Sequence, residues 1–284
     1  MVQPNNPLIK HFRQPALYIK LTSNGNYWRE GTLELPVTGE IPVYPMTTKD
    51  EITLRTPDAL LNGTSVVNVI QSCCPNIKDA WAMPSVDVDS TLIAIRIASF
   101  GQTMPVEANC PSCNETHAYD VNLSSILGTI TMPDYSKTVN LADGLIIKLK
   151  PLNYLQISQN GSVMFEEEKL IQALSNPDIS PEDRKTSYDL HVNRLIDLNL
   201  DTVVNCTESI ATADGNLVTD PKFIKEYYAN AESSVNRAIQ EKIEEFAKSI
   251  NIKPLEVLCN EPECGTKFNL AINFDYASFF DRGF

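Results

Sequence analysis

The sequence predicts an α+β fold, in which a split zinc-ribbon-like β module encloses a helical insertion and follows a mixed N-terminal segment of strands and helices. Two observations predict it. Four of the seven cysteines form two short pairs, Cys110–Cys113 and Cys259–Cys264, and strand-like residues flank each pair. The chain between the pairs carries apolar residues at steps of three or four, which is the period of a helix.

A length of 284 residues fits one elaborate domain or two modest ones, and a hydrophobic content of 43% is enough for a core. We divide the chain into four segments: an N-terminal arm (1–30), a mixed strand and helix segment (31–105), the split zinc-ribbon module (106–150 plus 251–284) and the helical insertion (151–250).

The arm contains Pro4, Pro7 and Pro15, which break any helix, and its aromatic residues follow no clear period. One interpretation is a disordered tail. The other is an arm that docks on a neighbouring subunit, and this fits the aromatic and aliphatic content better, because solvated tails usually carry few such groups.

Two short strands and three helices are expected in the mixed segment. The strands are Thr32–Leu35 and Glu51–Arg55, and the helices begin at Thr56, at Thr64 or Ser65, and at residue 91. The third helix, 91–99, begins after Asp89 or Ser90 and ends before Gly101. A buried strand could also produce its apolar run.

The insertion is expected to follow a strand at Gly144–Lys150 and to hold three helices, at about 151–175, 180–210 and 220–250. The second helix has Ser180 as its cap and the third begins at Asp220-Pro221. A turn at Asp214-Gly215 separates them.

The two cysteine pairs predict one structural Zn²⁺ held by Cys110, Cys113, Cys259 and Cys264. Two close thiolates on each of two tight turns supply the four ligands of a tetrahedral site. Four cysteines close the ligand shell, whereas a catalytic zinc keeps one position open for water. Because the pairs lie 149 residues apart (259 − 110), the metal would join the middle of the chain to its C-terminal part.

Three alternatives compete with this site. Disulfides need an oxidising compartment, and the opening residues contain no apolar segment typical of a secretory signal, so we expect a reducing one. Buried, unreactive thiols are the better interpretation for Cys73, Cys74 and Cys206, which lie among apolar residues. His117, four residues after Cys113, could replace one cysteine as a ligand.

The net charge of −13 and the absence of a basic stripe near either pair argue against a nucleic-acid ligand, because such binding depends on Lys and Arg. No apolar run approaches the length of a membrane span. The acidic run Glu166–Glu168 is interpreted as a solvated helix face. Protein partners remain the expectation.

No catalytic motif is present: the sequence has no phosphate-binding glycine loop and no nucleophile elbow. His191 has no nucleophile beside it and is interpreted as a surface or core histidine. Asp87 and Asp89 are interpreted as helix-capping groups rather than as an acid pair. We therefore expect no enzyme.

The last eleven residues, 274–284, carry five aromatic rings. Such rings rarely stay in water, so they either fold back onto the ribbon or anchor in a pocket of a partner.

Three stretches of the first half, Leu54–Thr64, Ile70–Cys73 and Met83–Ala98, resemble baseplate hub proteins of T4-like contractile-tailed bacteriophages. In that group the block leads into a Cys-x-x-Cys segment, and a second cysteine pair precedes an aromatic C-terminus. The similarity covers about residues 45–125 and, more loosely, 255–284.

The resemblance implies a non-enzymatic component of the tail baseplate hub that contacts other tail proteins, through the arm or the aromatic C-terminus. It implies a location in the virion tail and, during assembly, in the host cytoplasm. The cysteines carry over as metal ligands. An assembly chaperone that is absent from the mature virion is the first alternative, and a zinc-ribbon nucleic-acid-binding regulator is the second.

Overall fold

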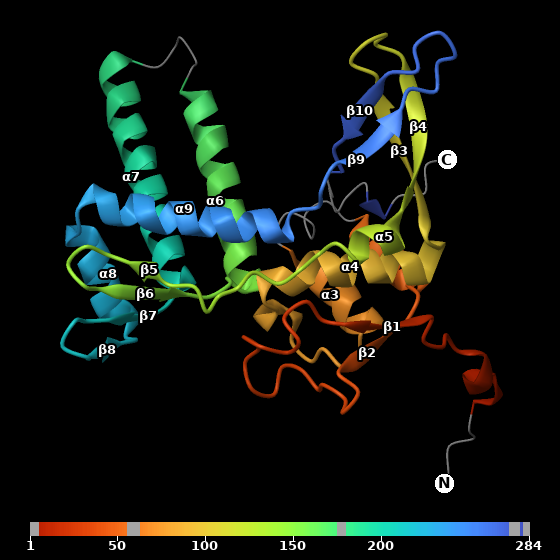
Figure 1. Cartoon of the computed structure of the whole chain (residues 1–284), viewed down its shortest axis with the longest axis horizontal. Helices are drawn as coiled ribbons and strands as arrows, with labels where there is room; N and C mark the ends of the chain where they lie inside the picture. Colours follow the sequence, from red (N-terminus) through yellow and green to blue (C-terminus); the bar gives the residue numbers. More distant parts are fainter. Residues whose placement is uncertain (1–5, 56–62, 175–179, 273–278, 281–284) are drawn as a thin grey trace.

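The computed structural model describes residues 6–55, 63–174, 180–272 and 279–280 (Figure 1). Its described part mixes helices with small antiparallel sheets, so the α+β prediction is confirmed. Two hydrophobic cores organise it. The first lies under the N-terminal half and the cysteine-bearing hairpins, and the second lies between a four-stranded sheet and the C-terminal helices.

The first core is built around a nearly enclosed helix, α4 (Ser85–Phe100), whose residues from Val86 to Arg96 are almost all buried. Around it lie the 3₁₀ turn η2 (Ala80–Ala82), the strands β1 (Leu17–Lys20) and β2 (Glu40–Val43), and the helices α1 (Thr48–Leu54) and α3 (Thr64–Cys73). The 3₁₀ turn η1 (Pro7–His11) precedes them and buries no residue. The strands pair antiparallel with Leu17 opposite Val43. The predicted helices at 64 and 91 are therefore present, and α4 begins earlier than expected.

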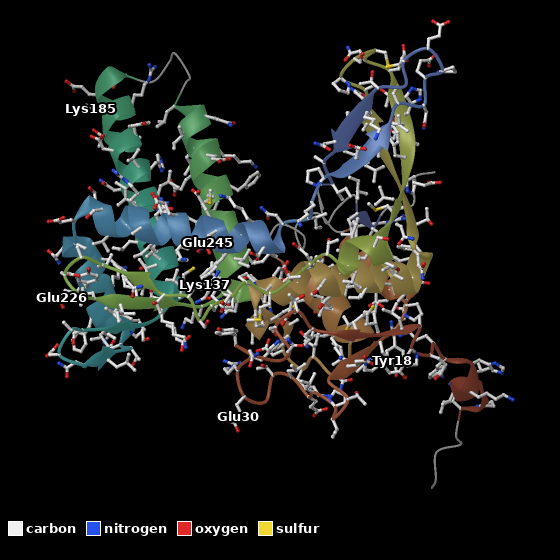
Figure 2. All side chains as sticks on the ribbon, in the orientation of Figure 1. Tyr18, Glu30, Lys137, Lys185, Glu226 and Glu245 are labelled. Carbon is white, nitrogen blue, oxygen red and sulfur yellow. The ribbon has the colours of Figure 1, made fainter. Side chains whose placement is uncertain are left out.

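Residues 17–28 pack on the chain's own core, which corrects the expectation of a free or docking arm for this part. Ile19 and Leu21 are buried, and Tyr18 projects outward from β1 (Figure 2). Further along, the Ser23 N–H and hydroxyl and the Trp28 Nε1–H donate to the fully buried carboxylate of Asp87, at 2.6 to 2.8 Å. Asp87 thus fastens the N-terminal segment to α4 and is not a helix cap.

The strand predicted at Glu51–Arg55 is wrong, because α1 occupies Thr48–Leu54. Thr47 accepts from the Asp50 N–H while Asp50 accepts from the Thr47 N–H, and this reciprocal cap starts a helix where the alternating polarity favoured a strand. At Thr32–Leu35 only an isolated bridge from Leu33 to Ile77 forms. The helix expected at Thr56 lies outside the described residues.

The second core lies between a sheet of order β5-β6-β7-β8 and the helices that follow. The strands are β5 (Val139–Asn140), β6 (Ile146–Leu149), β7 (Thr207–Ala211) and β8 (Leu217–Val218). The helices that contribute to this core are α7 (Pro181–Cys206), α8 (Pro221–Asn230) and α9 (Ser233–Ile250), whereas α6 (Tyr154–Ala173) contributes no residue to it, and α5 (Leu123–Leu127) precedes the sheet.

Two predicted helices of the insertion differ in extent. The second ends at Cys206, and Ile210 belongs to β7, where it lies opposite Ile147 of β6. The third is divided into α8 and α9, because Ala231 and Glu232 adopt extended backbone conformations. The first helix and the strand near 144–150 are where the sequence predicted them.

The two cores meet where α6 begins. Tyr154 stacks on Trp81 at 5.8 Å, and Val86 of α4 belongs to the second core. Backbone bonds from Ser85 to Leu152 and from Tyr154 to Met83 join the same two segments. Lys137, in the segment that leads to the sheet, lies 3.8 Å from Glu245 of α9 (Figure 2).

Candidate metal centre

Two β-hairpins carry the predicted ligands. The first consists of β3 (Thr103–Asn109) and β4 (Thr116–Asn122), and the second of β9 (Leu255–Leu258) and β10 (Lys267–Leu270). Figure 1 shows the two hairpins beside each other, with their turns at the same end. Rings of Tyr119 and Phe268 meet between them, edge to face, at 5.7 Å.

The two turns have the same local geometry although their cysteine spacings differ. The N–H of Cys110 donates to Glu115 and the N–H of Cys259 donates to Thr266, both at 2.9 Å. One residue after the second cysteine, Asn114 and Gly265 have φ values of 64° and 53°. Asn and Gly tolerate this left-handed conformation best, and it returns each chain into its second strand.

The four sulfur atoms of Cys110, Cys113, Cys259 and Cys264 lie within 4.8 Å of one another. The Cys110–Cys264 and Cys113–Cys259 sulfur pairs are 3.8 and 3.6 Å apart. A tetrahedron with Zn–S bonds of about 2.3 Å has edges of about 3.8 Å. The four cysteines are therefore placed so that they could hold one metal ion.

Backbone N–H groups point at the sulfurs. The N–H of Ser112 lies 3.5 Å from Cys110 Sγ, and the N–H of Glu261 lies 3.5 Å from Cys259 Sγ. The Thr266 hydroxyl and N–H lower the pKa of Cys264 to about 6, and the Cys113 N–H lowers the pKa of Cys110. These donors stabilise thiolates, which are the form that binds metal.

The other two thiols resist ionisation. The Glu261 N–H lowers the pKa of Cys259, but desolvation and the neighbouring thiols outweigh it, so that this pKa rises to about 12. For Cys113 the Glu115 N–H is likewise outweighed, and its pKa is raised. Four adjacent thiolates repel one another, so a cation is needed to hold all of them ionised.

The positions of His117 and of the other three cysteines bear on the alternatives to a four-cysteine site. In its described residues every cysteine is a free thiol, and His117, on β4, is not part of the four-sulfur group. Cys73, Cys74 and Cys206 are buried away from that group. Burial raises the pKa of Cys73 to about 12 and that of Cys206 to about 11, which disfavours the thiolate form that reacts or binds metal.

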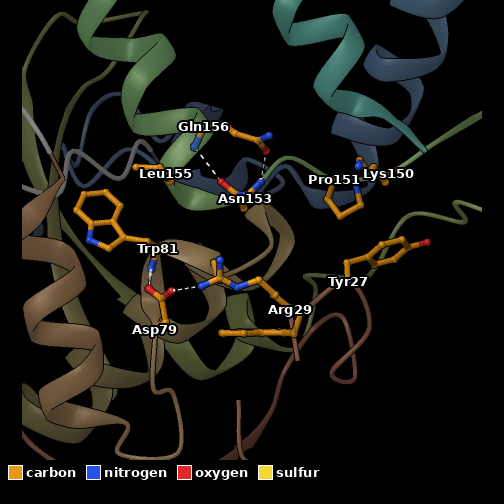
Figure 3. Close-up of a pocket in the computed structure, with 11 residues that line it drawn as sticks. Tyr27, Arg29, Asp79, Trp81, Lys150, Pro151, Asn153, Leu155 and Gln156 are labelled. Carbon is orange, nitrogen blue, oxygen red and sulfur yellow. Dashed lines mark hydrogen bonds and ion pairs between the residues drawn. The ribbon is translucent and has the colours of Figure 1, made fainter. Parts of the chain in front are cut away.

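The cavity in Figure 3 has a volume of about 360 Å³ and lies where the two cores meet. Its polar groups are engaged in structural bonds. Asp79 accepts from the Trp81 N–H and pairs with Arg29 at 3.0 Å, while Asn153 and Gln156 cap the start of α6 reciprocally. We assign this cavity no chemistry.

One polar cluster was missed by the sequence reasoning. Glu167, interpreted as part of a solvated acidic face, is completely buried between α6 and α7. Its carboxylate oxygens lie 2.6 Å from His191 Nδ1 and 2.7 Å from an Arg194 nitrogen. Glu166 and Glu168 are exposed as expected. His191 and Arg194 follow Glu167 by 24 and 27 residues, and no local sequence signal links them to it.

Comparison with known proteins gives one match. A family model described as T4 bacteriophage base plate protein matches residues 29–281, which include both cysteine pairs. No curated protein and no solved structure matches the chain. Within the described residues, no helix has both the length and the apolarity that a membrane span requires. Because the matched residues cover most of its length, the chain belongs to the T4 bacteriophage base plate protein family.

Proposed function

We propose that this chain is a non-enzymatic structural subunit of the hub region of the phage tail baseplate, and that Cys110, Cys113, Cys259 and Cys264 hold one structural Zn²⁺. The family match carries the proposal, because it spans both hairpins and the helical insertion together. The baseplate role accounts for an acidic chain with a thiol cluster and without a catalytic motif.

Zinc suits this donor set better than magnesium or calcium, which prefer oxygen ligands. Thiolates are soft ligands, and four of them in a tetrahedral arrangement are typical of Zn²⁺ or of iron–sulfur chemistry. A closed shell of four cysteines leaves no position for water, so the metal would stabilise the fold instead of performing a reaction. Its effect would be to fasten the second hairpin to the first, and with it the C-terminal end of the insertion.

Contacts with other tail proteins follow from the family, and their location on this chain is part of the proposal. Leu8, Ile9 and Phe12 are exposed on and after η1, just before Arg13 anchors the segment by donating to the Pro45 and Ser72 carbonyls. This short apolar stretch supports contact through the N-terminal arm. At the other end, Phe279 and Phe280 are buried on the first core, which favours folding back over insertion into a partner.

Quantitative mass spectrometry of purified phage particles tests the role. A structural subunit is expected at a fixed stoichiometry with other baseplate proteins, and in host cytoplasm only during assembly. Absence from mature particles, with presence in assembly intermediates, would identify a chaperone. Tight, salt-dependent DNA binding by the purified protein would identify a nucleic-acid-binding regulator instead.

A further inference from the structure

A buried hydroxyl without a hydrogen bond lies next to the four-sulfur group. Tyr119, on β4, is 7% exposed, and its hydroxyl oxygen is fully buried. Within the part of the chain that the structure describes, this hydroxyl forms no hydrogen bond. An unbonded polar group is costly to bury, and a buried tyrosine usually directs its hydroxyl at a partner. A phenylalanine would fill the same space without that cost, so the hydroxyl indicates an acceptor close by.

The ring of Tyr119 is fixed between the two hairpins, on the side of Cys259. It meets Phe268 of β10 edge to face at 5.7 Å. The side-chain amide of Asn260 donates to the Ala118 carbonyl at 3.5 Å, which places the residue after Cys259 against the residue before Tyr119. Burial raises the pKa of Tyr119, and Cys259 raises it further, more than any other charged group does. The hydroxyl therefore lies near the sulfur of Cys259.

Two other neighbours of the hydroxyl do not supply the acceptor. The Asn260 N–H approaches the hydroxyl oxygen and opposes the rise of this pKa, but an N–H donates and offers the hydroxyl proton no acceptor. His117, on the same face of β4, has a buried Nε2 that is also unbonded, so the His117 and Tyr119 side chains are not bonded to each other. The sulfur of Cys259 remains. A thiol is a weak acceptor, whereas a charged thiolate accepts strongly.

Cys259 is also the ligand that most needs a further donor. Cys110 and Cys259 are the two buried members of the four-sulfur group, so water is not available to donate to their sulfurs. Two backbone N–H groups, those of Ser112 and Cys113, approach Cys110. Among the described residues, Cys259 has one backbone donor, the Glu261 N–H at 3.5 Å. Because a buried negative charge is stabilised by hydrogen-bond donors, a thiolate at Cys259 would gain most from another one.

We propose that Tyr119 is a positioning residue of the metal centre, and that its hydroxyl donates a hydrogen bond to the metal-bound thiolate of Cys259. Thr266 is the precedent in the same hairpin, because its hydroxyl lies 3.3 Å from the sulfur of Cys264. The bond from Tyr119 would join the first hairpin to a ligand of the second. Its role rests on the proposed four-cysteine centre and adds a residue outside the ligand set. Loss of such outer-shell partners typically lowers metal affinity by about 10- to 100-fold.

The test uses the full-length protein with Zn²⁺ or Co²⁺ and compares the wild type with Tyr119→Phe, which keeps the ring. The matched control is Tyr135→Phe, because Tyr135 is also 7% exposed but belongs to the second core. Competition with a chromophoric chelator measures zinc affinity. The sulfur-to-cobalt charge-transfer absorption reports hydrogen bonding to the ligand sulfurs. Thermal unfolding of the metal-free proteins reports packing.

Tyr119→Phe should weaken zinc binding at least about tenfold. It should also move the cobalt absorption to longer wavelength, because a thiolate that loses a hydrogen bond gives up electron density more easily. The metal-free variant should be at least as stable as the metal-free wild type, because it no longer buries an unbonded hydroxyl. The control should change zinc affinity less than about twofold and leave the cobalt absorption unchanged.

Three results would overturn the role of Tyr119 while leaving the metal centre intact. They are a zinc affinity of Tyr119→Phe within about twofold of the wild type, an unmoved cobalt absorption, and equal effects of both variants. A loss of stability in metal-free Tyr119→Phe that matches the loss of zinc affinity would also overturn it, because the side chain would then act through packing alone. A wild type that binds neither metal would refute the centre itself, and the role of Tyr119 with it.

Discussion

Replacing Cys113 and Cys264 together with serine removes one thiolate from each hairpin and leaves two sulfurs that cannot complete a zinc site. The metal would close a chain segment of 149 residues between Cys110 and Cys259 (259 − 110). In the chain-entropy description, a cross-link of that span contributes about 5 kcal/mol at most. Because the second core folds within the segment and already orders it, we expect a loss of about 2 to 4 kcal/mol.

The loss of stability should be concentrated in the second hairpin, β9–β10. Strands β9 and β10 have four residues each, and Leu270 is their only buried side chain. An isolated two-stranded hairpin of this kind is marginal in water. Zinc removal should therefore release this hairpin from β3–β4, while the sheet that contains β6 and β7 stays folded on its own core.

Hydrogen exchange with mass spectrometry, combined with thermal unfolding, measures both effects. In the double variant, and in the wild type with a chelator, amides of 255–270 should exchange much faster and those of β6 and β7 should not. Ser112→Ala, an exposed position in the first turn that keeps its backbone N–H, is the control for substitution at the turn. Unchanged exchange of 255–270 and unchanged thermal stability in Cys113→Ser/Cys264→Ser would refute the reasoning.

Three further predictions concern binding and stability. Because protons compete with the metal for the thiolates, zinc affinity should fall as the pH is lowered from about 8 to about 5. A competition titration with a chromophoric chelator measures this affinity, and a value that does not change with pH would contradict the prediction. Burial raises the pKa of Asp87 above its usual 3.8, which the bonds from Ser23 and Trp28 only partly offset, so the folded state binds this proton more tightly than the unfolded state does. The free energy of unfolding should therefore increase as the pH falls through this raised pKa toward 3.8. Asp87→Asn should remove that part of the pH dependence, which denaturant titrations measure. Arg96 donates to the Phe279 carbonyl and lies 5.4 and 5.2 Å from the Phe100 and Phe279 ring centroids. Arg96→Met should cost about 1.5 to 3 kcal/mol of unfolding free energy, and a change below 0.5 kcal/mol would count against an anchoring role.

The elements that could be predicted from the sequence are those determined by residues that lie close to one another along the chain. The two hairpins follow from cysteine spacing between strand-like residues, and α4 and α6 follow from their helical period, although α4 begins at Ser85 and not after the predicted cap, Asp89 or Ser90. The four-sulfur group could be predicted because the same pattern, two thiols on a tight turn, occurs twice. Each pair supplies only two of the four ligands of a tetrahedral site, so the two pairs are expected to meet.

Errors occurred where a distant contact decides the local structure. Ile210 fits a helical line, but the strand Ile146–Leu149 pairs with its segment and makes it extended. Asp87 precedes a helical run and looks like a cap, yet its partners are Ser23 and Trp28, more than fifty residues earlier. Sequence periodicity contains no information on such pairings.

Glu167 illustrates the same limit at the level of a site. Its neighbours Glu166 and Glu168 are exposed, and a run of three glutamates favours a solvated face. Burial of the middle one becomes evident only when α7 brings His191 and Arg194 against it.

X-ray absorption at the zinc edge of the purified full-length protein tests the proposed centre most directly. The account predicts one zinc per chain, coordinated by four sulfurs at about 2.3 Å, and a Cys206→Ser variant with the same spectrum. A protein purified without zinc, or a zinc shell that contains nitrogen or oxygen ligands, would contradict it.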